Sequence, residues 1–330
     1  MKNILTKLLL CMAMFISACN LRENTSNERR SGEKIEQYST NACYKRNINT
    51  SNFETSIIPH ELTKYDIILN DYGTIVDYIG NYMYIIIPIQ IEGMSIIAIG
   101  NNAFSRKNLR SVLIPDGITL IGEHAFSHNE LTELTIPDSV ITIGGSAFFW
   151  NNLTSITIPD NVIYIGDMAF GGGSRLGGNH ITNVTIGNNV KYIGNGAFGR
   201  NLLRSLIIPN SVVSIGADAF MRNNLEYVSL GNNIISIGSA AFYWNRLSNI
   251  NIPDSVTYIG SGAFIANQLT KIIIGDNLLF NSNKSNINNE LPLINAFDNG
   301  FDELYIVNER RAGTYLLYDG QWQIKSTTSP

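Results

Sequence analysis

Apolar residues recur along most of the chain with a period of 22 residues. The dipeptide Ala-Phe appears eight times at this spacing, apart from one interval of 28 residues, and an Ile-Gly pair starts four residues before each copy. A fixed period of this length indicates a solenoid, in which each repeat forms one turn and stacks on its neighbours. The eight copies begin at Ala103, Ala125, Ala147, Ala169, Ala197, Ala219, Ala241 and Ala263.

Residues 109–130 make up one complete repeat. Val112 and Ile114 lie on one side of an extended segment and Leu113 on the other, so the alternation predicts a short strand with one buried face. The proline that follows ends the strand because it has no amide hydrogen to donate. Phe126 and its equivalents are expected to stack in the solenoid interior. One repeat buries too little apolar surface to fold alone, so each turn must cover the next.

The consensus of the repeat is Leu-x-x-Val-x-Ile-Pro-Asp-x-Val-x-x-Ile-Gly-x-x-Ala-Phe-x-x-Asn. It resembles the BspA-like, treponemal class of leucine-rich repeats over eight units in residues 99–280. The resemblance implies a mainly β leucine-rich-repeat solenoid with 22-residue repeats, short parallel strands and turns, capped at both ends. It also implies attachment to protein partners, such as host extracellular-matrix or cell-surface proteins, or to other bacteria. The residues by themselves imply a long, rigid and weakly charged surface.

The repeat becomes irregular towards both ends of the array. Residues 65–98 are expected to hold an N-terminal capping region and an irregular first repeat, with a hairpin over Asp66–Tyr78. Residues 281–330 are expected to hold a degenerate repeat, marked by Ala296-Phe297, and a C-terminal cap. Within this last segment, the apolar run Leu304–Val307 predicts a further strand.

The N-terminus has the features of a bacterial lipoprotein signal peptide. Residues 1–18 combine Lys2 and Lys7 with an apolar run that is too short to span a bilayer comfortably. The run ends in Ile-Ser-Ala-Cys, which resembles a site where cleavage precedes a cysteine, here Cys19, that becomes acylated. Several acyl chains hold a protein firmly to a membrane, so we expect a lipid-anchored protein of the bacterial cell envelope, surface-exposed on the outer membrane. The alternative is an ordinary secretory signal followed by a chance cysteine.

Residues 19–64 are interpreted as a flexible, solvated tether between the lipid and the folded body. The tether holds seven basic and six acidic residues, whereas residues 99–280, about four times as many, hold ten and eleven. The low charge of the whole chain, 15% of residues with a net charge of −4, therefore belongs to the repeat array. A near-neutral array gives no cationic surface for nucleic acid. It favours short-range contact with a partner over electrostatic steering.

The sequence contains no arrangement expected of a catalytic, metal or cofactor site. His124 and His128 are four residues apart, but no third ligand has matching spacing, and both are interpreted as surface residues. With Cys19 acylated, only Cys43 remains in the mature chain, so no intrachain disulfide is expected. The 28-residue interval contains an insertion, Gly171–His180, that lacks the Gly-Lys-Ser/Thr ending of a phosphate loop. We expect a protruding loop there, with Arg175 as a candidate binding residue.

Two sets of positions are candidates for partner binding. The two residues after Ala-Phe are Phe149-Trp150 and Tyr243-Trp244 in equivalent turns, while Arg200 and Arg222 stand at the second position of other turns. This mixture is typical of interface anchors, although the rings would also stiffen the flank by packing on neighbouring turns. The asparagine that comes next is predicted to bond to turn backbone. The second set faces outward on the predicted strands, which are expected to form one exposed sheet: Thr135, Thr157, Thr185 and Tyr227.

Several functions remain open at this point. Threonine suits an exposed strand whether or not the strand binds a partner. The family resemblance favours adhesion through protein–protein contact. The alternatives are a structural lipoprotein that organises the envelope from the periplasmic side, and a glycan-binding module that uses the aromatic turns. An enzyme is the least favoured interpretation.

Overall fold

The computed structural model describes residues 58–173, 178–275, 278–280, 296–297 and 300–325. The chain divides into two units, Met1–Ser56 and Ile57–Pro330, and all described residues belong to the second. The predicted signal peptide, Cys19, Cys43, Arg175 and most of the predicted tether lie outside the described residues.

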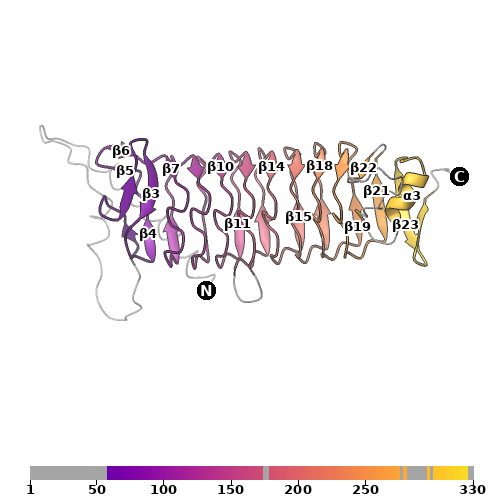
Figure 1. Ribbon diagram of the computed structural model, residues 1–330, viewed down its shortest axis with the longest axis horizontal. Coiled ribbons are helices and arrows are strands. Elements are labelled where there is room, and N and C mark those ends of the chain that lie inside the picture. Colours follow the sequence, from indigo (N-terminus) through magenta and orange to yellow (C-terminus); the bar gives the residue numbers. More distant parts are fainter. Residues whose placement is uncertain (1–57, 174–177, 276–277, 281–295, 298–299, 326–330) are drawn as a thin grey trace, which may run out of the picture. The chain divides into compact units, whose positions relative to one another are not determined.

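The described part of the chain is a mainly β solenoid, as predicted, with turns that follow one another about every 22 residues (Figure 1). The Ile-Gly segment of each turn forms a two-residue strand, which pairs in parallel with the equivalent strands of neighbouring turns. Together with the two strands of an N-terminal hairpin and one strand after the last repeat, these eight strands make one sheet of eleven strands over the described ranges, called here the long sheet. In order, its strands are β2 (Ile67–Leu69), β3 (Thr74–Tyr78), β7 (Ala98–Ile99), β9 (Leu120–Ile121), β10 (Thr142–Ile143), β12 (Tyr164–Ile165), β14 (Tyr192–Ile193), β16 (Ser214–Ile215), β18 (Ser236–Ile237), β20 (Tyr258–Ile259) and β22 (Leu279–Phe280).

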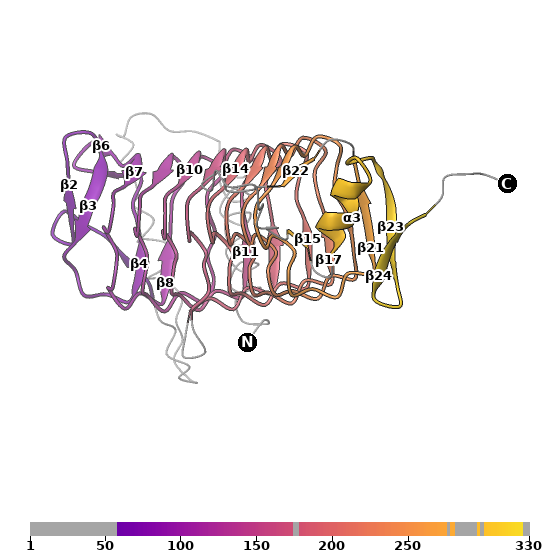
Figure 2. The ribbon, with the colours of Figure 1, turned by 45° about the vertical axis from the view of Figure 1, so that its right-hand side comes forward.

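The strands that precede the repeat prolines form several short sheets on the other side of the turns (Figure 2). The expectation of one exposed sheet along the array is therefore wrong, and Thr135 lies outside any strand. These outer strands pair in the orders β1-β4-β8, β11-β13, β15-β17 and β19-β21-β23-β24. Their bounds are β1 (His60–Glu61), β4 (Tyr84–Ile86), β8 (Ser111–Leu113), β11 (Ser155–Thr157), β13 (Asn183–Thr185), β15 (Ser205–Ile207), β17 (Tyr227–Ser229), β19 (Asn249–Asn251), β21 (Lys271–Ile274), β23 (Gly313–Tyr318) and β24 (Gln321–Ile324).

Glycine explains why the long sheet is continuous. A Cβ atom on Gly166 would lie 2.4 Å from the amide nitrogen of Gly145 in the preceding turn. Only a residue without a side chain lets two backbones approach so closely. Among the outer strands, β13, β17 and β21 are followed by Gly187, Gly231 and Gly275 in place of the repeat proline, and each pairs with the strand of the preceding turn. The pairing is interrupted between β13 and β15 and between β17 and β19.

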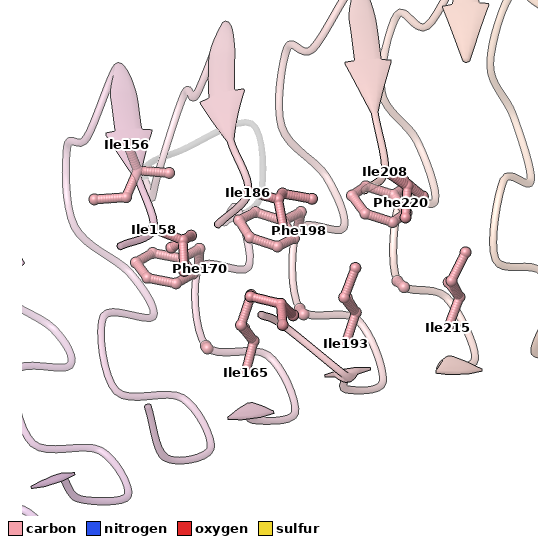
Figure 3. Packing of buried hydrophobic residues seen from close by; sticks show 14 of the residues in the cluster. Ile156, Ile158, Ile165, Phe170, Ile186, Ile193, Phe198, Ile208, Ile215 and Phe220 are labelled. Carbon is pink, nitrogen blue, oxygen red and sulfur yellow. The ribbon is translucent and has the colours of Figure 1, made fainter. Parts of the chain in front are cut away.

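A column of aromatic rings runs through the core, as predicted. Phenylalanine rings of successive turns stack nearly parallel, with centroids 4.9 to 5.6 Å apart, and every ring is fully buried. Figure 3 shows Phe170, Phe198 and Phe220 of this stack between isoleucines of the two strand segments. The stack continues to Tyr78 at one end and to Phe297 at the other. Each turn thus covers the apolar side chains of the turns on either side, which is why the repeats fold together.

A row of asparagines, buried except for the half-buried Asn267 at its end, bonds the turns to one another, again as predicted. Asn151 donates through Nδ2 to the carbonyl oxygens of Phe126 (2.9 Å) and Phe148 (3.1 Å), and its Oδ1 accepts from the Leu131 amide (3.1 Å). Asn179 makes the equivalent contacts in the turn that carries the insertion. The insertion displaces Asn179 from the 22-residue register, so the repeat pattern does not reveal it. The row comprises Asn129, Asn151, Asn179, Asn201, Asn223, Asn245 and Asn267.

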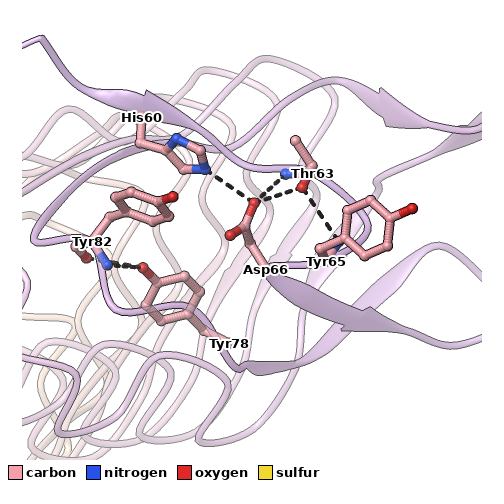
Figure 4. Close-up of polar contacts among 6 residues, drawn as sticks. All are labelled: His60, Thr63, Tyr65, Asp66, Tyr78 and Tyr82. Carbon is pink, nitrogen blue, oxygen red and sulfur yellow. Dashed lines mark hydrogen bonds and ion pairs between the residues drawn. The ribbon is translucent and has the colours of Figure 1, made fainter.

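The N-terminal cap contains the predicted hairpin, in which β2 pairs antiparallel with β3. The folded body begins before residue 65, however, because β1 pairs in parallel with β4 and Leu62 is buried. Asp66 anchors this start by accepting hydrogen bonds from His60 and Thr63 (Figure 4). Burial raises the pKa of Asp66, but the bonds from His60 and Thr63 outweigh it and hold the pKa below its ordinary value. The extra residues after Pro88 form a small antiparallel pair, β5 (Gln90–Ile91) and β6 (Met94–Ser95).

At the C-terminal end, the predicted strand Leu304–Val307 is wrong, because this segment belongs to the helix α3 (Phe301–Val307). Phe301 and Tyr305 are four residues apart and both are fully buried, which is helical spacing. The predicted cap is present: β23 pairs antiparallel with β21 and with β24. The Phe301 ring contacts the rings of Tyr315 and Trp322 from these two strands, so the cap covers the end of the core.

Candidate functional site

The second residue after seven of the eight repeat Phe residues has a left-handed backbone, with φ between 54° and 59°; the exception is Gly172, after Phe170. This conformation is uncommon for residues other than glycine. It is held by hydrogen bonds between turns, such as the one that the Arg222 amide donates to the Tyr243 carbonyl oxygen (2.8 Å). The resulting set is called here the corner row: Arg106, His128, Trp150, Arg200, Arg222, Trp244 and Ala266.

The two tryptophans of the corner row have different surroundings although the sequence makes them equivalent. Trp150 is half-buried and stacks on His128, with ring centroids 5.8 Å apart. Trp244 is 55% exposed, and the Arg222 guanidinium lies 4.9 Å from its ring centroid. The first residues of the two pairs, Phe149 and Tyr243, are half-buried edge-on partners of these rings.

His128 is half-buried between the rings of Phe149 and Trp150, which corrects its interpretation as an ordinary surface histidine. Burial lowers the pKa of its imidazole, and the positive charge of Arg106 and the neighbouring His124 lower it further. The rings of His128, Phe149 and Trp150 make this part of the corner row an aromatic cluster.

Two shallow grooves follow the corner row. One, of about 410 Å³, lies beside Trp244 and is lined by Asn224, Arg246, Ala266 and Gln268. The other, of about 280 Å³, lies beside Arg200 and Arg222 and includes His180 and Leu202. The structure therefore brings three predicted site residues, Arg200, Arg222 and Trp244, to one edge of the solenoid.

The outer strands carry the second predicted set. Thr157 and Thr185 are exposed and directly paired between β11 and β13. Tyr227 is 55% exposed but belongs to a separate pair of strands, β15 and β17. Thr135 is exposed outside any strand. The four residues thus share an orientation without forming one hydrogen-bonded ladder.

The outward side of the long sheet carries an apolar surface that sequence reasoning missed. Backbone hydrogen bonds link it from turn to turn, for example from the Ile163 amide to the Ile141 carbonyl oxygen (2.9 Å). A groove of about 480 Å³ runs beside Ile141 and Ile163 and is lined by Ser139, Asn161, Asn189 and Lys191. We call this surface the apolar strip; its seven residues are 40–50% exposed: Ile97, Leu120, Ile141, Ile163, Tyr164, Tyr192 and Ile235.

One sequence pattern could have predicted the apolar strip. Isoleucine recurs two residues before the core isoleucine of the Ile-Gly pair. Ile97, Ile141, Ile163 and Ile235 all stand there, while Thr119 and Thr257 stand there in other turns. In a single turn, an isoleucine at this position would be interpreted as part of the hydrophobic core. Only the fold shows that the position faces outward.

In the described part of the chain, no three His, Cys, Asp or Glu residues are grouped as metal ligands would be. None of the helices in the described ranges is long and apolar enough to cross a membrane.

A family model and a solved structure agree with this fold. The model of the BspA type leucine rich repeat region matches residues 97–178 and 177–291, with six copies of the repeat. A leucine-rich repeat protein from Bacteroides ovatus is 23% identical, with a TM-score of 0.53 over 72% of this chain and 67% of that chain. The leucine-rich repeat protein of T. pallidum is 27% identical, with a TM-score of 0.48 over 56% of this chain and 88% of that one. None of the curated proteins matches the chain.

Proposed function

The chain belongs to the family of BspA-type leucine-rich repeat proteins, and from this premise we propose that it binds a protein partner on the bacterial surface. In this proposal an acylated Cys19 holds the chain to the outer membrane. The solenoid then attaches the cell to host extracellular-matrix or cell-surface proteins, or to other bacteria. Leucine-rich repeat scaffolds present wide, rigid surfaces to their partners, which fits contact with another protein.

The apolar strip is the observation that carries the proposal. Seven large apolar or aromatic side chains stand exposed on one sheet. Six of them lie in five consecutive turns, from Ile97 to Tyr192, and Ile235 lies two turns further on. Scattered exposed apolar residues are normal on soluble proteins, but contiguous ones mark contact surfaces. Isoleucine and tyrosine on a rigid sheet can be covered with little loss of side-chain entropy.

The charge of this surface indicates what kind of partner fits it. Among the two residues that precede the Ile-Gly pair in each turn, from Ile97 to Tyr258, the only charged side chain is Lys191. A highly charged partner would lose its hydration there without gaining ion pairs. We therefore expect a partner whose contact surface is apolar and nearly uncharged. The predicted residues of the corner row and outer strands, including Trp150 and Thr157, stay candidates for a wider contact, as do Phe149 and Tyr243, which precede corner-row residues.

Binding is tested by biolayer interferometry of the purified full chain against a panel of purified matrix and host cell-surface proteins. The test variant is Ile141→Thr/Ile163→Thr, because threonine occupies the same repeat position at Thr119 and Thr257. The matched control is Ile207→Thr on the outer strand β15, since Thr157 and Thr185 occupy that position elsewhere.

The double variant is expected to weaken binding by about tenfold or more, which corresponds to about 1.4 kcal/mol of lost contact. Ile207→Thr is expected to leave the affinity unchanged, although Ile207 is 68% exposed. Absence of binding to every protein of the panel would contradict the proposal. Equal weakening by Ile207→Thr would place the contact elsewhere than the apolar strip.

Surface display is tested separately by treating intact cells with protease. Cleavage of the chain on intact cells is expected, and protection until the envelope is opened would favour a structural lipoprotein facing the periplasm. Cys19→Ala is expected to release the chain from the membrane fraction. Full retention of this variant would contradict the lipid anchor.

A further inference from the structure

Arginines gather on one flank of the solenoid, between the phenylalanine stack and the outer strands. Residues 178–275 contain four arginines, and all of them stand in this part of their turns: Arg200, Arg204, Arg222 and Arg246. The same residues contain only three acidic side chains, and of these only Glu226 stands in the same part of its turn. The flank is therefore locally cationic on a chain whose net charge is −4.

Arg200 and Arg222 form no salt bridge with the described residues. Both are exposed corner-row residues in successive turns. Burial raises the pKa of the Asp218 carboxyl group, and the charge of Arg200 opposes that rise. Arginine is suited to binding carboxylate and sulfate groups in the fork of its guanidinium.

The groove beside Trp244 supplies a different kind of contact. Arg222 lies over the Trp244 ring, and the groove is bordered by the small Ala266. Two side-chain amides, Asn224 and Gln268, line the same groove together with Arg246. An exposed aromatic face ringed by amides is suited to a sugar, whose C–H face packs on the ring while its hydroxyls bond to the amides.

We propose that this edge of the solenoid is a binding site for an acidic polysaccharide. A sugar unit packs on Trp244, with Asn224 and Gln268 bonding its hydroxyls. The carboxylate or sulfate groups of the neighbouring units bind Arg200 and Arg222. Turns repeat at the spacing of the stacked phenylalanine rings, 4.9 to 5.6 Å, which is close to the length of one sugar unit in an extended chain. The site is separate from the apolar strip and does not depend on a protein partner there.

An acidic peptide fits this edge less well. It would satisfy the two arginines, but it would leave the Trp244 face and the two amides of the groove without matched partners. A polysaccharide uses all three features at the spacing of the turns. The two sources of negative charge in such polymers, carboxylate and sulfate, make the same contacts with a guanidinium.

The test measures binding of the purified full chain to polygalacturonic acid and dextran sulfate, with neutral dextran and polyglutamate as comparison polymers. The variants are Trp244→Ala and Arg200→Gln/Arg222→Gln. Alanine already stands at the equivalent position as Ala266, with φ of 59°. The matched controls are Trp150→Ala and Arg106→Gln, which change the same corner-row position outside both grooves.

At least one acidic polysaccharide is expected to bind, more weakly as salt is added, and both test variants are expected to lose about tenfold or more of the affinity. The controls are expected to bind as the unchanged chain does. Equal binding of neutral dextran would overturn the role of the arginines. Equal binding of polyglutamate, unaffected by Trp244→Ala, would overturn the assignment to a polysaccharide. A control variant that loses as much affinity as its test variant would remove the site from these grooves.

Discussion

Replacing Asn151 with alanine removes three hydrogen bonds from a fully buried position. The Leu131 amide loses its partner from Asn151 and stays buried, which costs about 1–3 kcal/mol. The two carbonyl oxygens are less affected, because each also accepts from a second asparagine. The Phe126 oxygen keeps Asn129 (2.9 Å) and the Phe148 oxygen keeps Asn179 (2.9 Å).

Each of these two lost bonds lowers stability by about 0.5–1.5 kcal/mol. The free energy of unfolding should therefore fall by about 2–6 kcal/mol in total. Urea unfolding of the purified chain, followed by far-ultraviolet circular dichroism, measures the change. Asn152→Ala is the matched control, because Asn152 is exposed and its role in the turn is a backbone hydrogen bond that alanine keeps.

Asn152→Ala is expected to change the free energy of unfolding by less than about 0.5 kcal/mol. A loss for Asn151→Ala that stays within about 1 kcal/mol of this control would refute the reasoning. It would mean that the asparagine row fills space without holding the turns together.

Three further predictions concern the core, the N-terminal cap and the long sheet. Phe198→Ala should lower the free energy of unfolding by about 3–5 kcal/mol in the same urea assay, because the ring is fully buried between two others. A loss below about 1 kcal/mol would contradict a tightly packed phenylalanine stack. The hydrogen bonds from His60 and Thr63 hold the pKa of Asp66 below the ordinary 3.8, so their stabilisation is present above that value and is lost as the pH falls through the lowered pKa. Urea midpoints measured across this range should fall for the unchanged chain, and Asp66→Asn should remove that part of the fall. Gly166→Ala should lower the melting temperature more than Gly145→Ala, because a Cβ atom would lie 2.4 Å from backbone at Gly166 but no closer than 3.4 Å to a neighbouring atom at Gly145; equal losses would mean that the backbones do not approach closely.

The 22-residue period was sufficient to predict the solenoid, the phenylalanine stack and the asparagine row. These features repeat once per turn and depend on local chemistry: a large ring in the core and an amide beside bent backbone. A side chain such as Phe126 has the same role in each turn, so its periodicity determines its place.

The long sheet was not predicted, and the physical reason lies in its strands. A strand of two residues, such as Thr142–Ile143, is too short to show alternation. Its pairing depends on the close approach that the following glycine allows, which is a property of two turns together. The apolar strip was not predicted for the same reason, since Ile141 and Ile163 face outward only once this sheet is formed.

The C-terminal helix shows a related limit. The apolar run Leu304–Val307 is compatible with a strand or with part of a helix. Tertiary packing decides between them, because Phe301 and Tyr305 both reach the core only from a helix. For the corner row, the sequence placed Trp150 and Trp244 in equivalent positions correctly. Their different exposure follows from the neighbouring turn, which supplies His128 to one ring and Arg222 to the other.

The most direct test of protein binding through the apolar strip is hydroxyl-radical footprinting of the full chain in complex with the protein it captures from the panel. Tyr164 and Tyr192 are 40% and 49% exposed in the strip, while Tyr227 and Trp244 are each 55% exposed on other surfaces. We predict that the partner protects Tyr164 and Tyr192 from oxidation and leaves Tyr227 and Trp244 as reactive as in the free chain. Protection of Tyr227 or Trp244, with Tyr164 and Tyr192 unchanged, would contradict binding through the apolar strip.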